Sequence, residues 1–244
     1  MTIIFVHGVP DTSALWVPLI QSPQFTEDNY LTPDLPGFGS PWPSGFQPTK
    51  DGYAAWIIDF IEDATSKNGG PVDLVGHDWG ALLVLRAASL RPGLVRSWTA
   101  IDAVIQPGYV WHKTAKRWQT PIVGEALMAL SSPKLLRKGL IQAGVPKDLA
   151  ATEASHWNAL MKKSILSLYR SAKTAAYEWA ADLDKLPEKG LVIFGENDPF
   201  ISADIARQFA TDRDVPIHVE PDTGHWVLAE VPDRVATLIS EHVA

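Results

Sequence analysis

The sequence contains no cysteine, which excludes disulfide bonds, thiolate metal ligands and a cysteine nucleophile. It also has no apolar run close to the roughly 20 residues that a membrane-spanning helix needs. The first residues, MTIIFVHG, lack the basic start and the small-residue cleavage site of a secretory signal. We therefore expect a cytoplasmic protein without membrane partners, whose chemistry uses oxygen and nitrogen side chains and needs no metal or cofactor.

Positive charge is scarce overall and is concentrated in one segment. The chain has 21 Lys/Arg against 28 Asp/Glu, and its net charge of −7 disfavours binding to nucleic acid. Residues 103–186 nevertheless hold 12 Lys/Arg and 6 Asp/Glu, a net charge of +6. A solvated basic surface is the ordinary meaning of such a segment. The alternative is a lid that attracts anionic or electron-rich substrates.

Short β-branched runs alternate with longer helical patterns, which is typical of βαβ units and a parallel sheet. With 244 residues, of which 46% are hydrophobic, the chain can form one α/β domain. Residues 103–183 contain only helical patterns, and we expect a helical cap there, between core segments 1–102 and 184–244. The predicted strands are Ile3–Val6, Tyr30–Thr32, Val72–Val75, Val95–Ile101, Leu191–Phe194 and Ile217–Glu220. The predicted helices are Ser13–Leu19, Asp51–Lys67, Gly80–Leu90, Ala126–Leu130, Pro133–Ala143, Lys147–Met161, Lys162–Trp179, Ala203–Thr211 and Asp233–Val243.

The segment VDLVGHDWG, residues 72–80, places an aspartate in a sharp strand-to-helix turn. The pattern is that of the nucleophile elbow G-x-S-x-G, with Asp78 in place of serine. Asp78 could instead cap the following helix. Gly76 and Gly80, however, stand where such a turn has no room for side chains. A carboxylate at a helix N-terminus is also kept ionised by the helix dipole. We predict that Asp78 is a nucleophile.

A base and an orienting acid follow Asp78 in the sequence. His225, in PDTGHW, follows the last predicted strand and is our candidate base. Asp198, in GENDPF, is the candidate acid, with Glu196 and Asp102 as alternatives. The order of nucleophile, acid and base is that of α/β-hydrolases. The geometric prediction is that His225 contacts Asp198 and faces Asp78 across a water-sized gap.

At this point the chain resembles the epoxide hydrolase and haloalkane dehalogenase branch of the α/β-hydrolases. The matching motifs are HGVP, DLPGFG, VGHDWG, GENDPF and TGHW, and they span nearly the whole sequence in the family's order. The resemblance implies an α/β-hydrolase fold with a helical cap, and an oxyanion hole formed by the backbone N–H groups of Val9 and Trp79. Family members usually have two strands before the HGxP strand, so we expect about six strands instead of eight. We also expect strained or cis geometry at Val9–Pro10.

An aspartate at this position changes the class of reaction. A carboxylate is a poor acyl acceptor, because it would form a high-energy anhydride, but it can displace a leaving group from saturated carbon and form an alkyl ester. His225 would then activate the water that hydrolyses this ester. The predicted reaction is hydrolysis of a small hydrophobic substrate through a covalent alkyl-enzyme intermediate.

The leaving group distinguishes the two substrate classes of the branch. Relatives that open epoxides use two cap tyrosines, and the resemblance points to Tyr169, in SLYRSA, with Tyr109 as a candidate second. Relatives that release halide use indole or amide N–H donors, and Val9 offers no such side chain where many carry asparagine. Trp79, Trp111 and Trp157 are candidate substrate-binding residues. We predict an epoxide hydrolase that produces a vicinal diol. The alternatives are a haloalkane dehalogenase, an esterase or lyase, and a non-catalytic ligand-binding relative.

Overall fold

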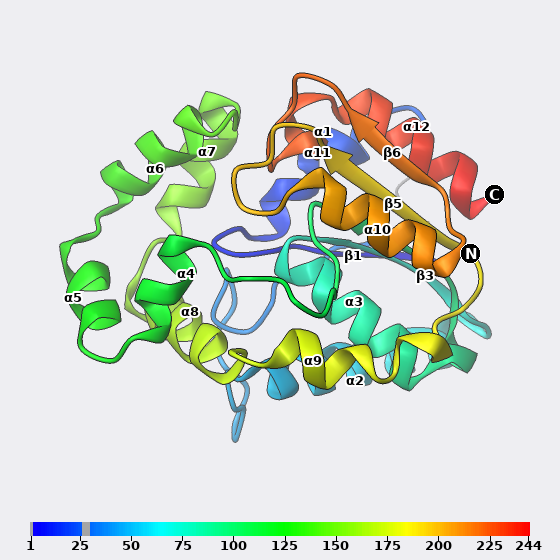
Figure 1. The fold of residues 1–244 in the computed structure, drawn as a ribbon, viewed down its shortest axis with the longest axis horizontal. Helices are drawn as coiled ribbons and strands as arrows, with labels where there is room; N and C mark the ends of the chain where they lie inside the picture. The colour runs from blue at the N-terminus through cyan, green and yellow to red at the C-terminus, as the bar shows by residue number, and fades with distance from the viewer. Residues whose placement is uncertain (1, 26–29) are drawn as a thin grey trace.

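The computed structural model describes residues 2–25 and 30–244, and in this part of the chain six parallel strands form one sheet (Figure 1). The strand order is β2-β1-β3-β4-β5-β6. The expected number of strands is therefore confirmed, and β3 continues to His77, two residues past its predicted end. The strands are β1 (Ile3–Val6), β2 (Tyr30–Leu31), β3 (Val72–His77), β4 (Val95–Ile101), β5 (Gly190–Gly195) and β6 (Ile217–Glu220).

The direction of winding reverses at β1, which lies between β2 and β3. Val6 pairs with Gly76, so the loops that follow β1 and β3 leave the sheet side by side. Open α/β sheets bind their ligands at such a switch point, outside the carboxyl ends of the strands. The HGVP loop and the Asp78 turn both lie there.

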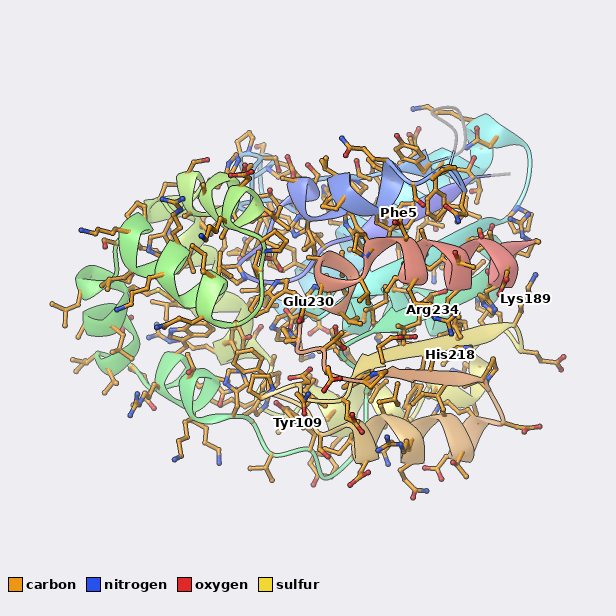
Figure 2. The ribbon with its side chains drawn as sticks, turned by 90° about the horizontal axis from the view of Figure 1, so that it is seen from above. Phe5, Tyr109, Lys189, His218, Glu230 and Arg234 are labelled. Carbon is orange, nitrogen blue, oxygen red and sulfur yellow. The ribbon has the colours of Figure 1, made fainter. Side chains whose placement is uncertain are left out.

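Helices cover both faces of the sheet, because its strands bury side chains in two directions. Ile4 and Val6 of β1 pack into the hydrophobic cluster that contains residues of α2, α3 and α10. Ile3 and Phe5 pack into the opposite cluster, with residues of α1, α11 and α12, and Phe5 is labelled in Figure 2. These helices are α1 (Val17–Ile20), α2 (Lys50–Asn68), α3 (Trp79–Leu90), α10 (Ala203–Arg213), α11 (Val227–Glu230) and α12 (Pro232–Val243), with single 3-10 turns at η1 (Ser13–Trp16) and η3 (Pro92–Leu94).

Between β4 and β5 the described residues form helices and their connecting loops, with no strand among them. Figure 1 shows most of these helices at one end of the molecule, with α5 and α6 farthest from the sheet, whereas α9 lies below α3 in this view. The elements are α4 (Lys113–Gln119), α5 (Val123–Leu130), α6 (Pro133–Gln142), α7 (Lys147–Ser155), α8 (Ala159–Ser171), α9 (Ala175–Ala180) and η4 (Leu183–Lys185).

The helix bounds predicted in this segment are partly wrong. The predicted helix Lys147–Met161 is interrupted, because Asn158 accepts the N–H of Met161 and caps a new helix, α8. The predicted helix Lys162–Trp179 is likewise divided between α8 and α9. Helix α4 was not predicted.

No helix in residues 2–25 and 30–244 combines the length and the apolar character that crossing a membrane requires.

Candidate active site

Asp78 lies at the turn between β3 and α3 in a backbone conformation that side chains rarely adopt. Its φ is 52° and its ψ is −122°. The turn is tight, since a Cβ on Gly80 would lie 1.9 Å from the carbonyl oxygen of Val6. Although Asp78 occupies the N-cap position of α3, its side chain makes no capping hydrogen bond. The carboxylate therefore does not act as a helix cap and is free to face the loops of the switch point.

The HGVP loop provides a backbone donor to this carboxylate. The N–H of Val9 donates to Asp78 Oδ1 at 2.9 Å, and the Val9–Pro10 peptide bond is cis, as expected. A side chain on Gly8 would collide with Asp78, because its Cβ would lie 2.5 Å from the Cβ of Asp78. The buried ring of His7 fixes the loop by bonding the carbonyl of Gly8 and accepting the N–H of Leu35. The turn motifs thus bring a donor to the position expected for an oxyanion hole.

His225 lies between Asp198 and Asp78. Its Nδ1 donates to Asp198 Oδ2 at 2.7 Å, and its Nε2 lies 3.4 Å from Asp78 Oδ2. The predicted contact with Asp198 is present. The separation from Asp78 is smaller than the water-sized gap that we expected, because an imidazole bearing a proton is attracted directly to the carboxylate.

Asp198 is oriented for this contact by its own loop. Its second oxygen, Oδ1, accepts the backbone N–H groups of Phe200 and Ile201 at 2.7 and 3.1 Å. The carboxylate is thus held by three hydrogen bonds and buried beside the imidazole.

The two alternative acids do not contact the imidazole Nδ1. Glu196 is exposed on the surface. Asp102 is fully buried, and its two oxygens accept the N–H groups of Gly195 and Val227 at 2.8 and 3.3 Å. Asp102 therefore ties the end of β5 to the chain just after His225, and it has a structural place beneath the site.

The charges in the site affect one another's protonation. Burial alone would raise the pKa of Asp78, but the hydrogen bond and charge of His225 lower it below its ordinary value. Burial would likewise lower the pKa of His225, but the Asp198 carboxylate, aided by Asp78, raises it well above the usual range. Near pH 7 the free site thus holds an ionised Asp78 beside an imidazolium.

Two cavities meet at Asp78. The first has an empty volume of about 540 Å³, including the part open to solvent, and the second about 850 Å³. Asp78, His112, Tyr169 and Phe200 line both. The first cavity continues beneath α9 toward Trp179, and the second continues past Val9 and His225 toward α6. Most of the side chains that line them are apolar.

Tyr169 is buried at the centre of an aromatic group above the nucleophile. Its ring centroid is 5.4 Å from that of Trp79, 5.5 Å from Trp111 and 5.0 Å from Trp118. Burial and the charge of Asp78 raise the pKa of its hydroxyl well above the ordinary value, so Tyr169 keeps its proton. The structure thus brings Trp79, Trp111 and Tyr169 together along the first cavity.

The other two predicted residues of the cap differ in their placement. Tyr109, labelled in Figure 2 where the helical segment meets the sheet, lines the first cavity, but its hydroxyl donates to the carbonyl of Phe200 at 3.4 Å. The prediction that Trp157 binds substrate is wrong, because this residue lines neither cavity. Its indole N–H donates to Ser131 at 3.1 Å, and Lys162 lies over its ring. Trp157 packs inside the helical segment.

Comparison with known proteins shows the family of the chain. Residues 3–238 match the sequence family described as "Alpha/beta hydrolase family". The chain belongs to the alpha/beta hydrolase family.

Individual members of the family resemble the chain along nearly its full length. The AB hydrolase superfamily protein YfhM of Bacillus subtilis is 24% identical over 263 residues, covering 99% of this chain and 89% of the relative. Haloalkane dehalogenase 2 of Mycobacterium tuberculosis is 27% identical over 265 residues, covering 98% and 86%. The solved structure of an epoxide hydrolase from Vigna radiata superposes with a TM-score of 0.78 at 20% identity, covering 99% and 90%, which is a likeness of fold.

The site of this alpha/beta hydrolase brings together groups of the kind that hydrolysis uses. Asp78 can attack, His225 can move a proton, and the N–H of Val9 can stabilise negative charge on Asp78 Oδ1. Within the described residues no group of three His, Asp or Glu side chains is arranged to hold a metal ion.

Two histidines of this site were missed by sequence reasoning. His77 is buried, and its Nε2 donates to the backbone carbonyl of His225 at 2.7 Å, so it supports the base. His112 lines both cavities. His77 could have been found from the sequence, because it directly precedes the nucleophile in the HD pair of the elbow motif. No local motif marks His112.

Proposed function

We propose that this alpha/beta hydrolase opens epoxides with Asp78 as nucleophile. Asp78 Oδ2 attacks a ring carbon, and Oδ1 becomes the carbonyl oxygen of the resulting alkyl ester. The hydrogen bond from Val9 to Oδ1 supports this division of roles, since it leaves Oδ2 facing the cavity and His225. The lowered pKa of Asp78 supplies the charged nucleophile without help from a base.

In the second step His225 takes a proton from water as that water attacks the ester carbon of Asp78. The oxyanion forms on Asp78 Oδ1, where the Val9 N–H already donates, and the resemblance adds the N–H of Trp79. Ester formation removes the Asp78 charge that helps Asp198 to raise the pKa of His225, so alkylation lowers this pKa and favours release of the imidazole proton. The base is thereby activated only after the covalent intermediate has formed.

The residues above Asp78 favour an oxygen leaving group. Tyr169 is buried in both cavities with a pKa well above the ordinary value, so its hydroxyl can donate to an alkoxide. Among the cap tryptophans, Trp157 donates to Ser131 and Trp179 donates to Asp51 at 3.4 Å. Residues 103–183 then act as a cap that supplies the acid and limits access of water.

One observation favours haloalkane dehalogenation as the second candidate. The rings of Trp79 and Trp111 are stacked, with centroids 5.8 Å apart, and both line the first cavity with Asp78. Two indole N–H groups in one cavity could bind a halide, and a relative of 27% identity is a haloalkane dehalogenase.

The variant His225→Gln tests both candidates, because it blocks the second step and leaves the first. Incubated with a styrene-oxide-type epoxide, it should gain the full mass of one epoxide, located on the peptide that contains Asp78. Incubated with a bromoalkane it should remain unmodified. The opposite result, a gain equal to the bromoalkane minus hydrogen bromide, would establish the dehalogenase alternative instead.

The matched control is Asp78→Asn, which should form no adduct, apart from a slow return of activity if the amide deamidates. In labelled water, a single wild-type turnover should place the heavy oxygen on Asp78, because water attacks the enzyme's carbonyl. Label in the diol during that first turnover would mean direct attack by water, with Asp78 as a base, and would exclude the covalent mechanism.

A further inference from the structure

His112 is a polar residue of the cavity with no part in the steps above. It lies in the loop that leads from β4 into α4, and it lines both cavities with Asp78, Tyr169 and Phe200. Its ring centroid is 5.0 Å from that of Phe200, whose ring is 4.9 Å from His225. The charges of Asp78, Asp198 and His225 all affect its pKa, so His112 lies within electrostatic reach of every member of the site.

The local hydrogen bonds determine which ring nitrogen carries the proton. Nδ1 of His112 accepts the N–H of Ala115 at 3.3 Å and caps α4. Burial lowers the pKa of the ring below its ordinary value, so the imidazole is neutral near pH 7. A neutral imidazole whose Nδ1 is an acceptor carries its proton on Nε2. Within residues 2–25 and 30–244, no protein acceptor takes this N–H.

A histidine is an uncommon choice for this position. Ser, Thr, Asp and Asn are the preferred N-caps, because their short side chains reach the free N–H groups of the first turn. Each of these would satisfy Ala115. Unlike them, the imidazole also carries a second nitrogen, and its ring lies against Phe200 and 6.5 Å from the ring of Tyr169.

We propose that His112 Nε2–H and the Tyr169 hydroxyl together bind the epoxide oxygen as the ring opens. This inference rests on the proposed function. It also replaces Tyr109 as the second donor, because the Tyr109 hydroxyl is directed to the carbonyl of Phe200. The rings of His112 and Tyr169 lie 6.5 Å apart, and both residues line the two cavities that Asp78 also lines.

The proton balance assigns different roles to the two donors. The bond from Asp78 Oδ2 to carbon forms as the carbon–oxygen bond of the ring breaks, and the electron pair goes to the epoxide oxygen. Tyr169 gives its proton to this oxygen, while the N–H of His112 donates a hydrogen bond and keeps its proton. The proton that His225 releases after alkylation restores Tyr169, and the proton that His225 then takes from water during ester hydrolysis restores the imidazolium.

The test uses single-turnover alkylation, measured by intact mass, in the His225→Gln background. His112→Ser keeps a strong N-cap and removes the second nitrogen, and it should slow alkylation by a styrene-oxide-type epoxide about 100-fold, the usual cost of losing a donor to developing charge. His112→Gln restores a terminal N–H donor and should recover at least tenfold of that loss. Thermal unfolding of both variants measures the contribution of the cap.

Each outcome separates the inference from the proposed function. If the His225→Gln parent forms no epoxide adduct, the proposed function is wrong. If the parent reacts and His112→Ser reacts equally fast, only the role of His112 is wrong. The same conclusion follows if the Ser and Gln variants lose rate in proportion to lost stability. Combining His112→Ser with Tyr169→Phe should cost less than the product of the two single effects, since both donors act on one oxygen.

Discussion

At the residue scale, the charges of Asp78, Asp198 and His225 affect one another's protonation. Asp78 and Asp198 both raise the pKa of His225, so the base is protonated when the enzyme is free. Once Asp78 is esterified, its contribution disappears and only Asp198 remains. The pKa of His225 must therefore be lower in the alkyl-enzyme than in the free enzyme.

This difference predicts how the rate depends on pH. As pH falls, kcat should decrease when His225 of the alkyl-enzyme becomes protonated, because hydrolysis needs the neutral imidazole. The ratio kcat/KM should stay constant down to a lower pH, where Asp78 is protonated, since its pKa is lowered. Steady-state kinetics from about pH 4 to 9, with mass spectrometry of the acid-quenched enzyme, should show ester accumulating as kcat falls. A parallel decrease of kcat and kcat/KM would contradict this.

Tyr169 gives a second prediction at this scale. Tyr169→Phe removes the proton that reaches the epoxide oxygen and should slow alkylation by roughly 10²–10³, while hydrolysis of a preformed ester changes little. Burst kinetics with an epoxide separate the two steps. Tyr177→Phe is the matched control, because Tyr177 belongs to α9 and is 63% exposed. A variant that keeps full alkylation would remove the main support for the epoxide assignment.

Sequence reasoning correctly placed those residues whose positions are set by short turn motifs. Asp78, Asp198, His225 and Val9 lie in loops that follow parallel strands, and such loops must meet at one edge of the sheet. It was wrong for Trp157 and silent on His112. Both belong to the helical segment, where the direction of a side chain depends on how helices pack against each other and not on neighbouring residues.

At the element scale, the turn between β3 and α3 depends on close contact with β1. A Cβ on Gly80 would lie 1.9 Å from the carbonyl oxygen of Val6 and 2.6 Å from that of His7. Gly80→Ala must therefore push α3 away from the start of the HGVP loop. We expect a loss of about 3 kcal/mol in unfolding free energy, from the cost of overpacking, and a lower kcat because the Val9 N–H moves away from Asp78.

Gly93→Ala is the control for this prediction, since a Cβ at Gly93 meets no atom within 4 Å. It should change stability by less than about 0.5 kcal/mol. Chemical denaturation with the two variants in parallel makes the comparison. Equal stabilities would mean that the contact between α3 and β1 is not close enough to restrict this position.

The strands could be predicted more accurately than the helices between β4 and β5. A buried parallel strand has a short apolar run with clear ends, whereas the predicted helix Lys147–Met161 continues from α7 into the start of α8. Their separation depends on Asn158, whose side chain caps α8. The unpredicted helix α4 begins at the cap formed by His112, a residue type that is uncommon at N-caps.

At the scale of the whole molecule, the helical segment and the sheet are joined by a buried hydrogen bond across 141 positions of the chain. Thr12, just after the HGVP loop, donates to Glu153 of α7 at 2.9 Å. Glu153 is fully buried, and its other oxygen has no partner within the described residues. Burial, reinforced by the charge of Asp11, raises the pKa of Glu153 to about 9. This contact between the two parts of the molecule therefore uses a protonated carboxyl group near pH 7.

The raised pKa predicts that the fold loses stability as pH increases. Between the ordinary pKa of glutamate and about 9, the folded protein binds a proton at Glu153 that the unfolded chain has released. Unfolding free energy should therefore fall over this window, by up to about 3 kcal/mol from pH 6 to pH 8 if the buried carboxyl stays protonated. Glu153→Gln accepts the Thr12 hydroxyl without binding a proton, so its stability should fall less over the same range.

The measurement is thermal or chemical unfolding at pH 6 and pH 8 for the wild type and for Glu153→Gln, with Glu188→Gln as the control. Glu188 is exposed, and its amide variant should follow the wild type at both pH values. The remaining slope in Glu153→Gln belongs to the other buried carboxyl groups, since burial raises the pKa of Asp11 to about 7 and that of Asp102 well above normal. If Glu153→Gln were as sensitive to pH as the wild type, Glu153 would have to be ionised in the fold. The buried charge of Glu153 would then have to be balanced by a rearrangement between α7 and the HGVP loop. In that case Glu153→Gln should alter activity at pH 8 as well as stability.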